Sequence, residues 1–183
     1  MNRGLDYNSN EIIHFYNNRI LNITAYWLLG FIEAKGTFGV KNLSMYFQIC
    51  QHFVSLGLLK SIKKFIENIP ITQYDLPLIK LKPNVTMALN KKTNVYSYVI
   101  SDIDVLFYVI LPFLNCLEFK SRRFVDFKLW SIGLLLRKYG YFYLAEGKIL
   151  LVDITKCINK QRYSTNKIKA TYISQKHVEG KKA

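Results

Sequence analysis

The stretch Leu28-Leu29-Gly30-Phe31-Ile32-Glu33-Ala34-Lys35-Gly36 is the part of this chain from which its fold can be inferred. Its composition predicts a short helix that Thr24 caps and that Gly36 ends in a left-handed conformation. Gly30 and Ala34 are four residues apart, so they share one face of that helix. Because neither carries a bulky side chain, a second helix can approach closely there. The sequence therefore predicts a helix that pairs with another of the same kind.

The composition predicts one folded domain with a polyanionic partner. The chain has 183 residues, of which 50% are hydrophobic and 15% aromatic, which is incompatible with general disorder. Lys and Arg outnumber Asp and Glu by 26 to 12, and the net charge of +14 favours nucleic acid as the partner. We expect no membrane association, because the most apolar stretch, residues 105–114, contains Pro112 and is shorter than the ~20 residues of a spanning helix.

Cysteine and histidine positions give no metal-binding pattern. The three cysteines are odd in number and widely spaced, and the three histidines share no ligand spacing, which argues against a disulfide framework and a zinc site. These residues are Cys50, Cys116, Cys157, His14, His52 and His177. We therefore predict buried thiols and no metal held by these side chains. The frequent Ile, Asn, Lys, Tyr and Phe residues are typical of AT-rich coding sequences such as those of mitochondrial genomes.

Hydrophobic periodicity predicts an alternation of helices and hairpins. In the expected strand at residues 45–51, Tyr46, Gln48 and Cys50 alternate with Phe47, Ile49 and Gln51, so one face is more polar. Asp102 is expected to cap a helix that ends or kinks at Pro112. The predicted helices cover residues 10–20, 56–69 (ended by Pro70), 119–138 and 146–160. The predicted strands cover residues 37–40, 45–51, 78–87 and 93–101, with turns at 41–44 and 88–92.

This order of elements predicts an α+β fold, in which one antiparallel sheet is backed by helices on one face and open on the other. We divide the chain into an N-terminal arm or linker (residues 1–22), a domain (residues 23–162) and a basic C-terminal tail (residues 163–183). Apolar periodicity fades in the tail while Lys and Arg persist.

The stretch at residues 28–36 resembles the signature helix of the LAGLIDADG homing endonucleases and intron maturases. The order of elements also resembles the αββαββα core of that family, whose sheet forms a saddle in the major groove of DNA. In the family, the eighth motif position is an acid that holds a divalent metal over the phosphodiester bond, and here it is Lys35. Only one copy of the motif is present. The resemblance therefore implies a homodimer, or pairing with a second LAGLIDADG half, through Gly30 and Ala34.

The similarity covers roughly residues 23–166 and extends to further site residues. It implies that Gln48 reads bases, that Gln51 lies beside the active site and that Arg123 supports the scissile phosphate. The pattern most resembles that of intron-encoded fungal mitochondrial members, so we expect a protein of the mitochondrial matrix.

Three functions are compatible with these observations. The first is a maturase or degenerate endonuclease that binds DNA or intron RNA without cleaving it alone, because an ammonium cannot supply the oxygen ligands that Mg²⁺ requires. The second is an active Mg²⁺-dependent endonuclease whose missing acid comes from another half. The third is a structural RNA-binding protein of a ribonucleoprotein. In the first, Gln48 and Gln51 would contact base edges, whereas in the second Gln51 and Arg123 would assist the metal site. The residues expected to contact phosphates are Lys41, Lys80, Lys82, Lys91 and Lys92. The simpler alternative for both glutamines is that they are solvent-exposed strand residues.

Overall fold

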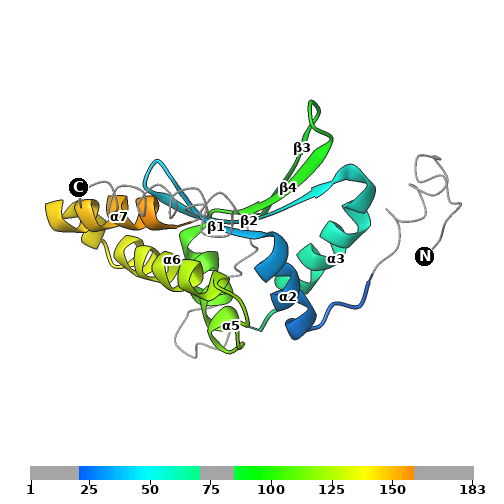
Figure 1. The fold of residues 1–183 in the computed structure, drawn as a ribbon, viewed down its shortest axis with the longest axis horizontal. Coiled ribbons are helices and arrows are strands. Elements are labelled where there is room, and N and C mark those ends of the chain that lie inside the picture. Colours follow the sequence, from blue (N-terminus) through cyan, green and yellow to red (C-terminus); the bar gives the residue numbers. More distant parts are fainter. Residues whose placement is uncertain (1–20, 71–84, 159–183) are drawn as a thin grey trace, which may run out of the picture.

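The fold is a four-stranded antiparallel sheet with helices against one face (Figure 1). The computed structural model describes residues 21–70 and 85–158. The strands lie in the order β1-β2-β4-β3, with β2 paired to β1 on one side and to β4 on the other. They comprise β1 (Gly36–Lys41), β2 (Ser44–His52), β3 (Val85–Asn90) and β4 (Val95–Ile100). This arrangement confirms the predicted α+β fold.

The helices lie on the underside of the sheet in the view of Figure 1, with α7 at the left end. The α-helices are α2 (Ala25–Lys35), α3 (Leu56–Glu67), α4 (Ile103–Val105), α5 (Leu111–Asn115), α6 (Arg123–Lys138) and α7 (Ala145–Cys157). Short 3-10 helices cover Phe53–Ser55 (η1) and Tyr141–Tyr143 (η3), and a π-helical turn, η2, covers Leu106–Ile110. In the described residues, every helix is too short or too polar to cross a membrane.

The core lies between the sheet and the helices. Along β2, Met45, Phe47 and Ile49 are fully buried, whereas the residues between them are only half-buried. The Trp130 indole of α6 is completely buried and donates a hydrogen bond to the Tyr46 carbonyl over 3.1 Å. Burial of each large apolar side chain contributes roughly 1.5–3 kcal/mol. The apolar side chains of β2 thus fix the helices to one face, and Tyr46, Gln48 and Cys50 point to the other.

The signature helix begins as predicted and ends differently. The Thr24 hydroxyl accepts a hydrogen bond from the Trp27 amide over 3.3 Å, which confirms the N-cap. Gly36 is not left-handed, because its φ of −72° and ψ of 151° are those of an extended residue. It begins β1 directly, paired with Ile49. Glycine fits because a Cβ at Gly36 would lie 2.7 Å from the Ile32 carbonyl oxygen.

Both hairpin turns lack glycine and use left-handed residues of other types. In the first turn Asn42 and Leu43 have φ of 50° and 61°. The second turn is displaced from the predicted residues 88–92, because β3 continues to Asn90 and the turn covers residues 91–94. The Asn90 side chain accepts a hydrogen bond from the Lys92 amide, and Asn94 adopts a φ of 53°. Asparagine tolerates this conformation, which explains the displaced turn.

Several predicted boundaries were wrong. Helix α3 ends at Glu67 instead of residue 69, and α7 covers residues 145–157 instead of 146–160. Helix α6 begins at Arg123 instead of residue 119. The Asp102 carboxylate caps α4 as predicted, by accepting hydrogen bonds from the Asp104 and Val105 amides. The π-helical turn precedes Pro112, which has no amide hydrogen to continue an α-helix.

The cysteines also differ from the prediction of buried thiols, because Cys116 is exposed and Cys50 and Cys157 are half-buried. The predicted helix at 10–20, most of the N-terminal arm, the strand residues 78–84 and the C-terminal tail lie outside the described residues.

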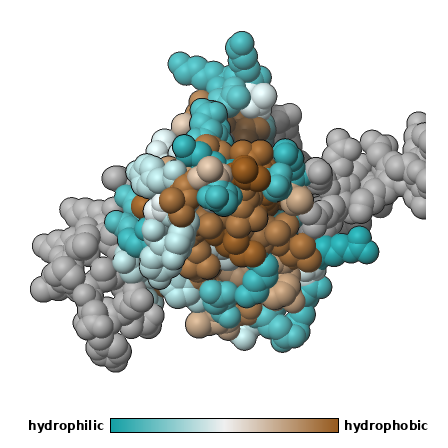
Figure 2. Space-filling model, turned by 90° about the vertical axis from the view of Figure 1, so that its left-hand side faces the viewer, coloured by the Kyte–Doolittle hydropathy of each residue, from teal (hydrophilic) through white to brown (hydrophobic). Residues whose placement is uncertain are grey.

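Figure 2 shows an apolar surface at the end of the molecule that α6 and α7 form. Exposed apolar residues of these two helices include Ile132 and Leu135 of α6 and Ile149 and Leu150 of α7. Exposed apolar surfaces commonly mark sites of association. This one belongs to elements other than the open sheet face and the signature helix.

Candidate nucleic-acid interface

The open face of the sheet carries a short row of polar side chains on β2. Gln48 donates a hydrogen bond through Nε2 to Cys50 Sγ over 2.9 Å, and Cys50 Sγ lies 3.3 Å from Ser97 Oγ on β4. Tyr46 shares this face, where its ring lies over Gly39: a Cβ added there would lie 2.2 Å from the ring. The face thus offers amide and hydroxyl groups at fixed positions. Such groups can pair with base edges.

A depression of about 540 Å³ lies on this face beside the β1–β2 turn. Its lining residues are Lys41, Asn42, Ser44, Met45, Tyr46, Gln48, Val99 and Ser101. Most of these carry hydrogen-bonding groups, and Lys41 adds a positive charge at the rim. The depression is therefore suited to an anionic, hydrogen-bonding ligand.

Exposed lysines lie at both ends of β2. Lys41 ends β1 beside the first turn, whereas Lys91 and Lys92 occupy the turn after β3. The register pairs Ser44 with Lys41 and His52 with Val95, which places the two turns at opposite ends of β2. In the described part of the chain, none of these three ammonium groups makes an ion pair. Lys80 and Lys82 lie outside the described residues.

Gln48 and Gln51 lie on opposite faces of the sheet. Gln48 belongs to the open face, whereas Gln51 alternates with it and shares the helix side with Ile49. Gln51 is therefore not placed to contact the same groove as Gln48. By the register, Gly36 pairs with Ile49, so Gln51 lies at the end of the sheet where α2 meets β1. Lys35 is the neighbouring residue at that junction.

Helix α2 presents an uncovered face with small residues. Gly30 and Ala34 are both exposed, and a Cβ added at Gly30 would meet nothing within 4 Å. Trp27 is 42% exposed and stacks on Phe31, with ring centroids 5.2 Å apart. Lys35, the last residue of the helix, is also exposed. The predicted pairing residues therefore do share one accessible face.

The carboxylate of Glu33 has a structural role that its sequence did not reveal. Its Oε1 accepts hydrogen bonds from the backbone amides of Lys120 and Ser121, over 2.8 and 2.6 Å. This contact connects α2 to the segment before α6. No sequence signal indicates it, because the partners are backbone groups 87 and 88 residues away.

Arg123 lies in the first turn of α6, close to a buried carboxylate. Its Nη1 lies 3.7 Å from Oδ2 of Asp126, whose side chain is completely buried. Buried carboxylates need such a partner. The i, i+3 spacing was a signal for this pair in the sequence, whereas the preceding Arg122 is exposed. Arg123 thus has a structural partner in addition to any contact with phosphate.

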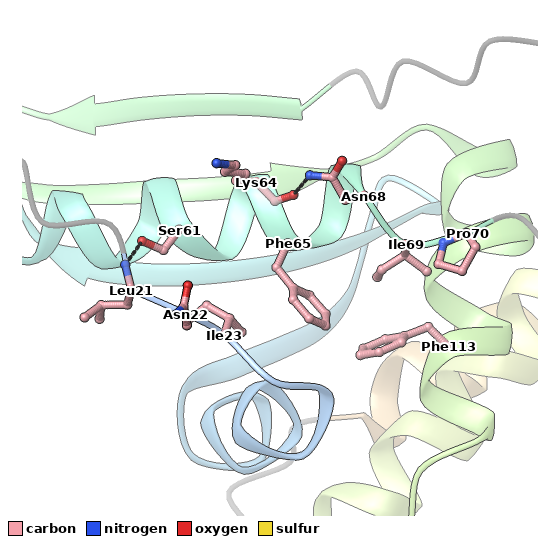
Figure 3. A pocket seen from close by; sticks show the side chains of 10 residues that line it. All are labelled: Leu21, Asn22, Ile23, Ser61, Lys64, Phe65, Asn68, Ile69, Pro70 and Phe113. Atoms are coloured by element: carbon pink, nitrogen blue, oxygen red, sulfur yellow. Dashed lines mark hydrogen bonds between the residues drawn. The ribbon is translucent and has the colours of Figure 1, made fainter.

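A second hollow, of about 530 Å³, lies on the helix side (Figure 3). It is bordered by residues 21–23, α3, Pro70 and Phe113. The Leu21 amide donates to Ser61 Oγ over 2.9 Å, and that hydroxyl donates to the Gly57 carbonyl. The remaining lining is mainly apolar, with Lys64 as its one charged group. This hollow has neither the charge nor the acid–base pairs of a catalytic site.

Metal-binding donors are sparse in the described residues. In residues 21–70 and 85–158, no group of three or more His, Cys, Asp or Glu side chains could hold a metal ion. Lys35 has no lone pair to donate, and Glu33 Oε1 already accepts two amide hydrogens. The donor set at the end of α2 therefore does not fit a divalent cation.

Comparison with known proteins gives the same family at the level of sequence and fold. The family model described as LAGLIDADG endonuclease matches residues 28–132. The "Uncharacterized mitochondrial protein RF1" of Saccharomyces cerevisiae is 31% identical over 185 residues, which cover 89% of this chain and 39% of that protein. The "Probable intron-encoded endonuclease Cox1-I1b" of Schizosaccharomyces pombe is 32% identical over 147 residues, which cover 78% of this chain and 33% of that protein. The chain thus spans less than half the length of these relatives.

Solved structures of homing endonucleases share the fold. The LAGLIDADG homing endonuclease I-GzeII in complex with its DNA target matches with a TM-score of 0.65 and 21% identity, over 79% of this chain and 47% of that one. I-LtrWI bound to target DNA matches with a TM-score of 0.66 and 19% identity, over 88% and 55%. The homing endonuclease I-TnaI matches with a TM-score of 0.62 and 20% identity, over 84% of this chain and 99% of that one. The fold of this chain therefore corresponds to about half of I-GzeII and I-LtrWI and to nearly all of I-TnaI.

Proposed function

Because the chain belongs to the LAGLIDADG endonuclease family, we propose that it binds DNA or intron RNA on the open face of its sheet and does not cleave its target alone. The observation that carries this proposal is the combination of a polar strand face with exposed lysines at both ends, which make no ion pair within residues 21–70 and 85–158. Phosphate contacts supply affinity, and contacts to bases supply selectivity. The solved structures of I-GzeII and I-LtrWI share this fold and hold target DNA, which supports DNA as a ligand.

The absence of cleavage by the lone chain follows from Lys35. Family members are typically Mg²⁺-dependent, and hard divalent cations require oxygen ligands. Two paired copies would bring two Lys35 ammonium groups together instead of two carboxylates. Binding can survive this change, because the open sheet face does not depend on residue 35. The role that fits best is that of a splicing factor or degenerate endonuclease in mitochondria, in keeping with its mitochondrial relative.

A partner half is part of this proposal. The uncovered face of α2 has Gly30 and Ala34 at its centre and Trp27 at its edge. Small residues permit close helix packing, and exposed aromatic residues commonly anchor interfaces. The partner is a second copy of this chain or a second LAGLIDADG half. The latter is favoured by relatives more than twice as long as the matched segment.

An active endonuclease is the second candidate, and the same length difference favours it. If another half supplies its own acid, this chain would contribute grip on the substrate, with Gln51 and Arg123 near the scissile phosphate. Mg²⁺ would then be needed for cleavage.

Binding and cleavage assays test both candidates. Purified protein is incubated with DNA that carries the intron-insertion site, and separately with the intron transcript, at moderate salt. Retention of either without nicking in Mg²⁺ supports the proposal, whereas nicking by the lone chain contradicts its second part. If neither ligand is retained, the proposed interface is wrong. Nicking gained by Lys35→Glu would show that one side chain silences an otherwise intact site.

A further inference from the structure

Lys35 occupies a defined and accessible position at the junction of helix and sheet. It is the last residue of α2, and the next residue, Gly36, is already paired in β1. Its side chain is exposed and makes no ion pair within the described residues. The junction lies at the same end of the sheet as Gln51. A positive charge is thus fixed where the helix ends.

The residues around this position do not replace the missing acid. Glu33 lies about 200° around the helix from Lys35. Its Oε1 is occupied by the amides of Lys120 and Ser121. Those hydrogen bonds direct the carboxylate toward the segment before α6. Residue 35 is therefore the position at which the acid is missing, and Glu33 does not take its place.

We propose that the Lys35 ammonium itself binds a backbone phosphate at the end of α2, so that this chain binds nucleic acid without a divalent cation. The inference rests on the proposed function and specifies its charge requirement. An ammonium is attracted to phosphate directly and offers three hydrogen-bond donors. A carboxylate at this position would instead repel phosphate unless a cation lay between them. Lysine thus supplies the positive charge that the acid can supply only through a metal.

A simpler role for Lys35 is that of a solvated cation near a helix C-terminus, which the helix dipole favours. That role predicts an effect on folding stability only. The phosphate-binding role predicts an effect on affinity, on its salt dependence and on its response to divalent cations. The two roles are therefore separable by experiment.

The test measures fluorescence anisotropy of a labelled, mixed-sequence DNA duplex in EDTA and in Mg²⁺ at matched ionic strength. The wild-type protein should bind the duplex with the same affinity in EDTA as in Mg²⁺. Lys35→Gln should weaken binding about fivefold at 0.15 M salt, and the slope of log K against log salt should become less steep by about 0.9, the value for one phosphate contact. Lys35→Glu should bind poorly in EDTA and regain affinity when Mg²⁺ or Ca²⁺ is added.

Matched controls separate local from general charge effects. Lys60→Gln and Lys60→Glu make the same charge changes on the exposed side of α3. They should change affinity less than twofold and give no response to divalent cations, and melting temperatures should show that all variants are folded. Equal affinity of Lys35→Gln and wild-type protein, or wild-type binding that requires Mg²⁺, would overturn the inference while leaving the proposed function intact. If the wild-type protein binds neither DNA nor RNA in any buffer, both fail.

Discussion

Removing the two lysines of the β3–β4 turn should weaken nucleic-acid binding by a predictable amount. Lys91 and Lys92 are exposed and lie at the opposite end of β2 from Lys41. With its nine residues, β2 is about 30 Å long, close to one turn of B-form DNA. A duplex on the open face would therefore meet both turns. Together with Lys35, these lysines offer four phosphate contacts.

The salt dependence follows from that count. Each contact contributes about 0.9 to the slope of log K against log salt, so these four should contribute about −3.6 to the wild-type slope. Between about 50 and 200 mM salt, their contribution to the wild-type affinity should fall about 150-fold. In Lys91→Gln/Lys92→Gln the slope should be less steep by about 1.8, the fall over this range about 12-fold smaller, and the affinity at 0.15 M salt about 30-fold weaker than that of wild type.

Anisotropy titrations of a labelled duplex at several salt concentrations would measure these slopes. The matched control is Lys60→Gln/Lys64→Gln, which removes the same charge from exposed positions of α3 on the helix side. Its slope should stay near that of the wild-type protein, because α3 lies on the helix side and the sheet separates it from the open face (Figure 1). Equal slopes for the two double variants would show that the net charge of the protein governs binding, and not the lysines at the open face of the sheet.

Four further substitutions test the packing and the association face. Gly147→Ala should destabilise the fold by about 1–3 kcal/mol, because its Cβ would lie 2.0 Å from the Tyr141 carbonyl oxygen. Gly30→Ala is the matched control and should be neutral or stabilising, so equal melting temperatures of these two variants would contradict the reasoning. Gly30→Leu should leave the monomer folded but block association in sedimentation experiments, and a persistent dimer would refute the α2 seam. Tyr98→Phe should raise the urea midpoint by removing a buried hydroxyl without a hydrogen-bond partner in the described residues, which costs about 1–3 kcal/mol. Burial, aided by the charge of Glu67, raises the pKa of Tyr98, so wild-type stability should fall above pH ~10, by up to about 1.4 kcal/mol per pH unit, and the variant should lack that loss.

The sequence was sufficient for features that depend on local patterns. The alternation along β2 correctly separated the buried Phe47 and Ile49 from Gln48, and a hydroxyl before an apolar helix correctly identified Thr24 as its cap. The exposed face shared by Gly30 and Ala34 followed from helical spacing alone. Each of these features is determined by neighbours within a few residues.

Features that depend on distant contacts were not predictable in this way. The link between α2 and the segment before α6 consists of hydrogen bonds from the amides of Lys120 and Ser121 to Glu33, and backbone donors leave no trace in residue types. The second turn was misplaced because asparagine replaces the glycine that usually marks such turns. Gly36 was assigned a left-handed conformation because its constraint, close approach to the Ile32 carbonyl, is steric and not conformational.

The division of roles within α2 explains how this chain can keep the fold without the acid. Leu28, Leu29 and Ile32 face the core, and Glu33 holds the segment before α6. Residue 35 contributes to neither, since its side chain is exposed and unpaired within the described residues. An acid-to-lysine change there removes a metal ligand while leaving core packing and the tether intact. Loss of the metal ligand therefore leaves intact the fold that carries the open sheet face.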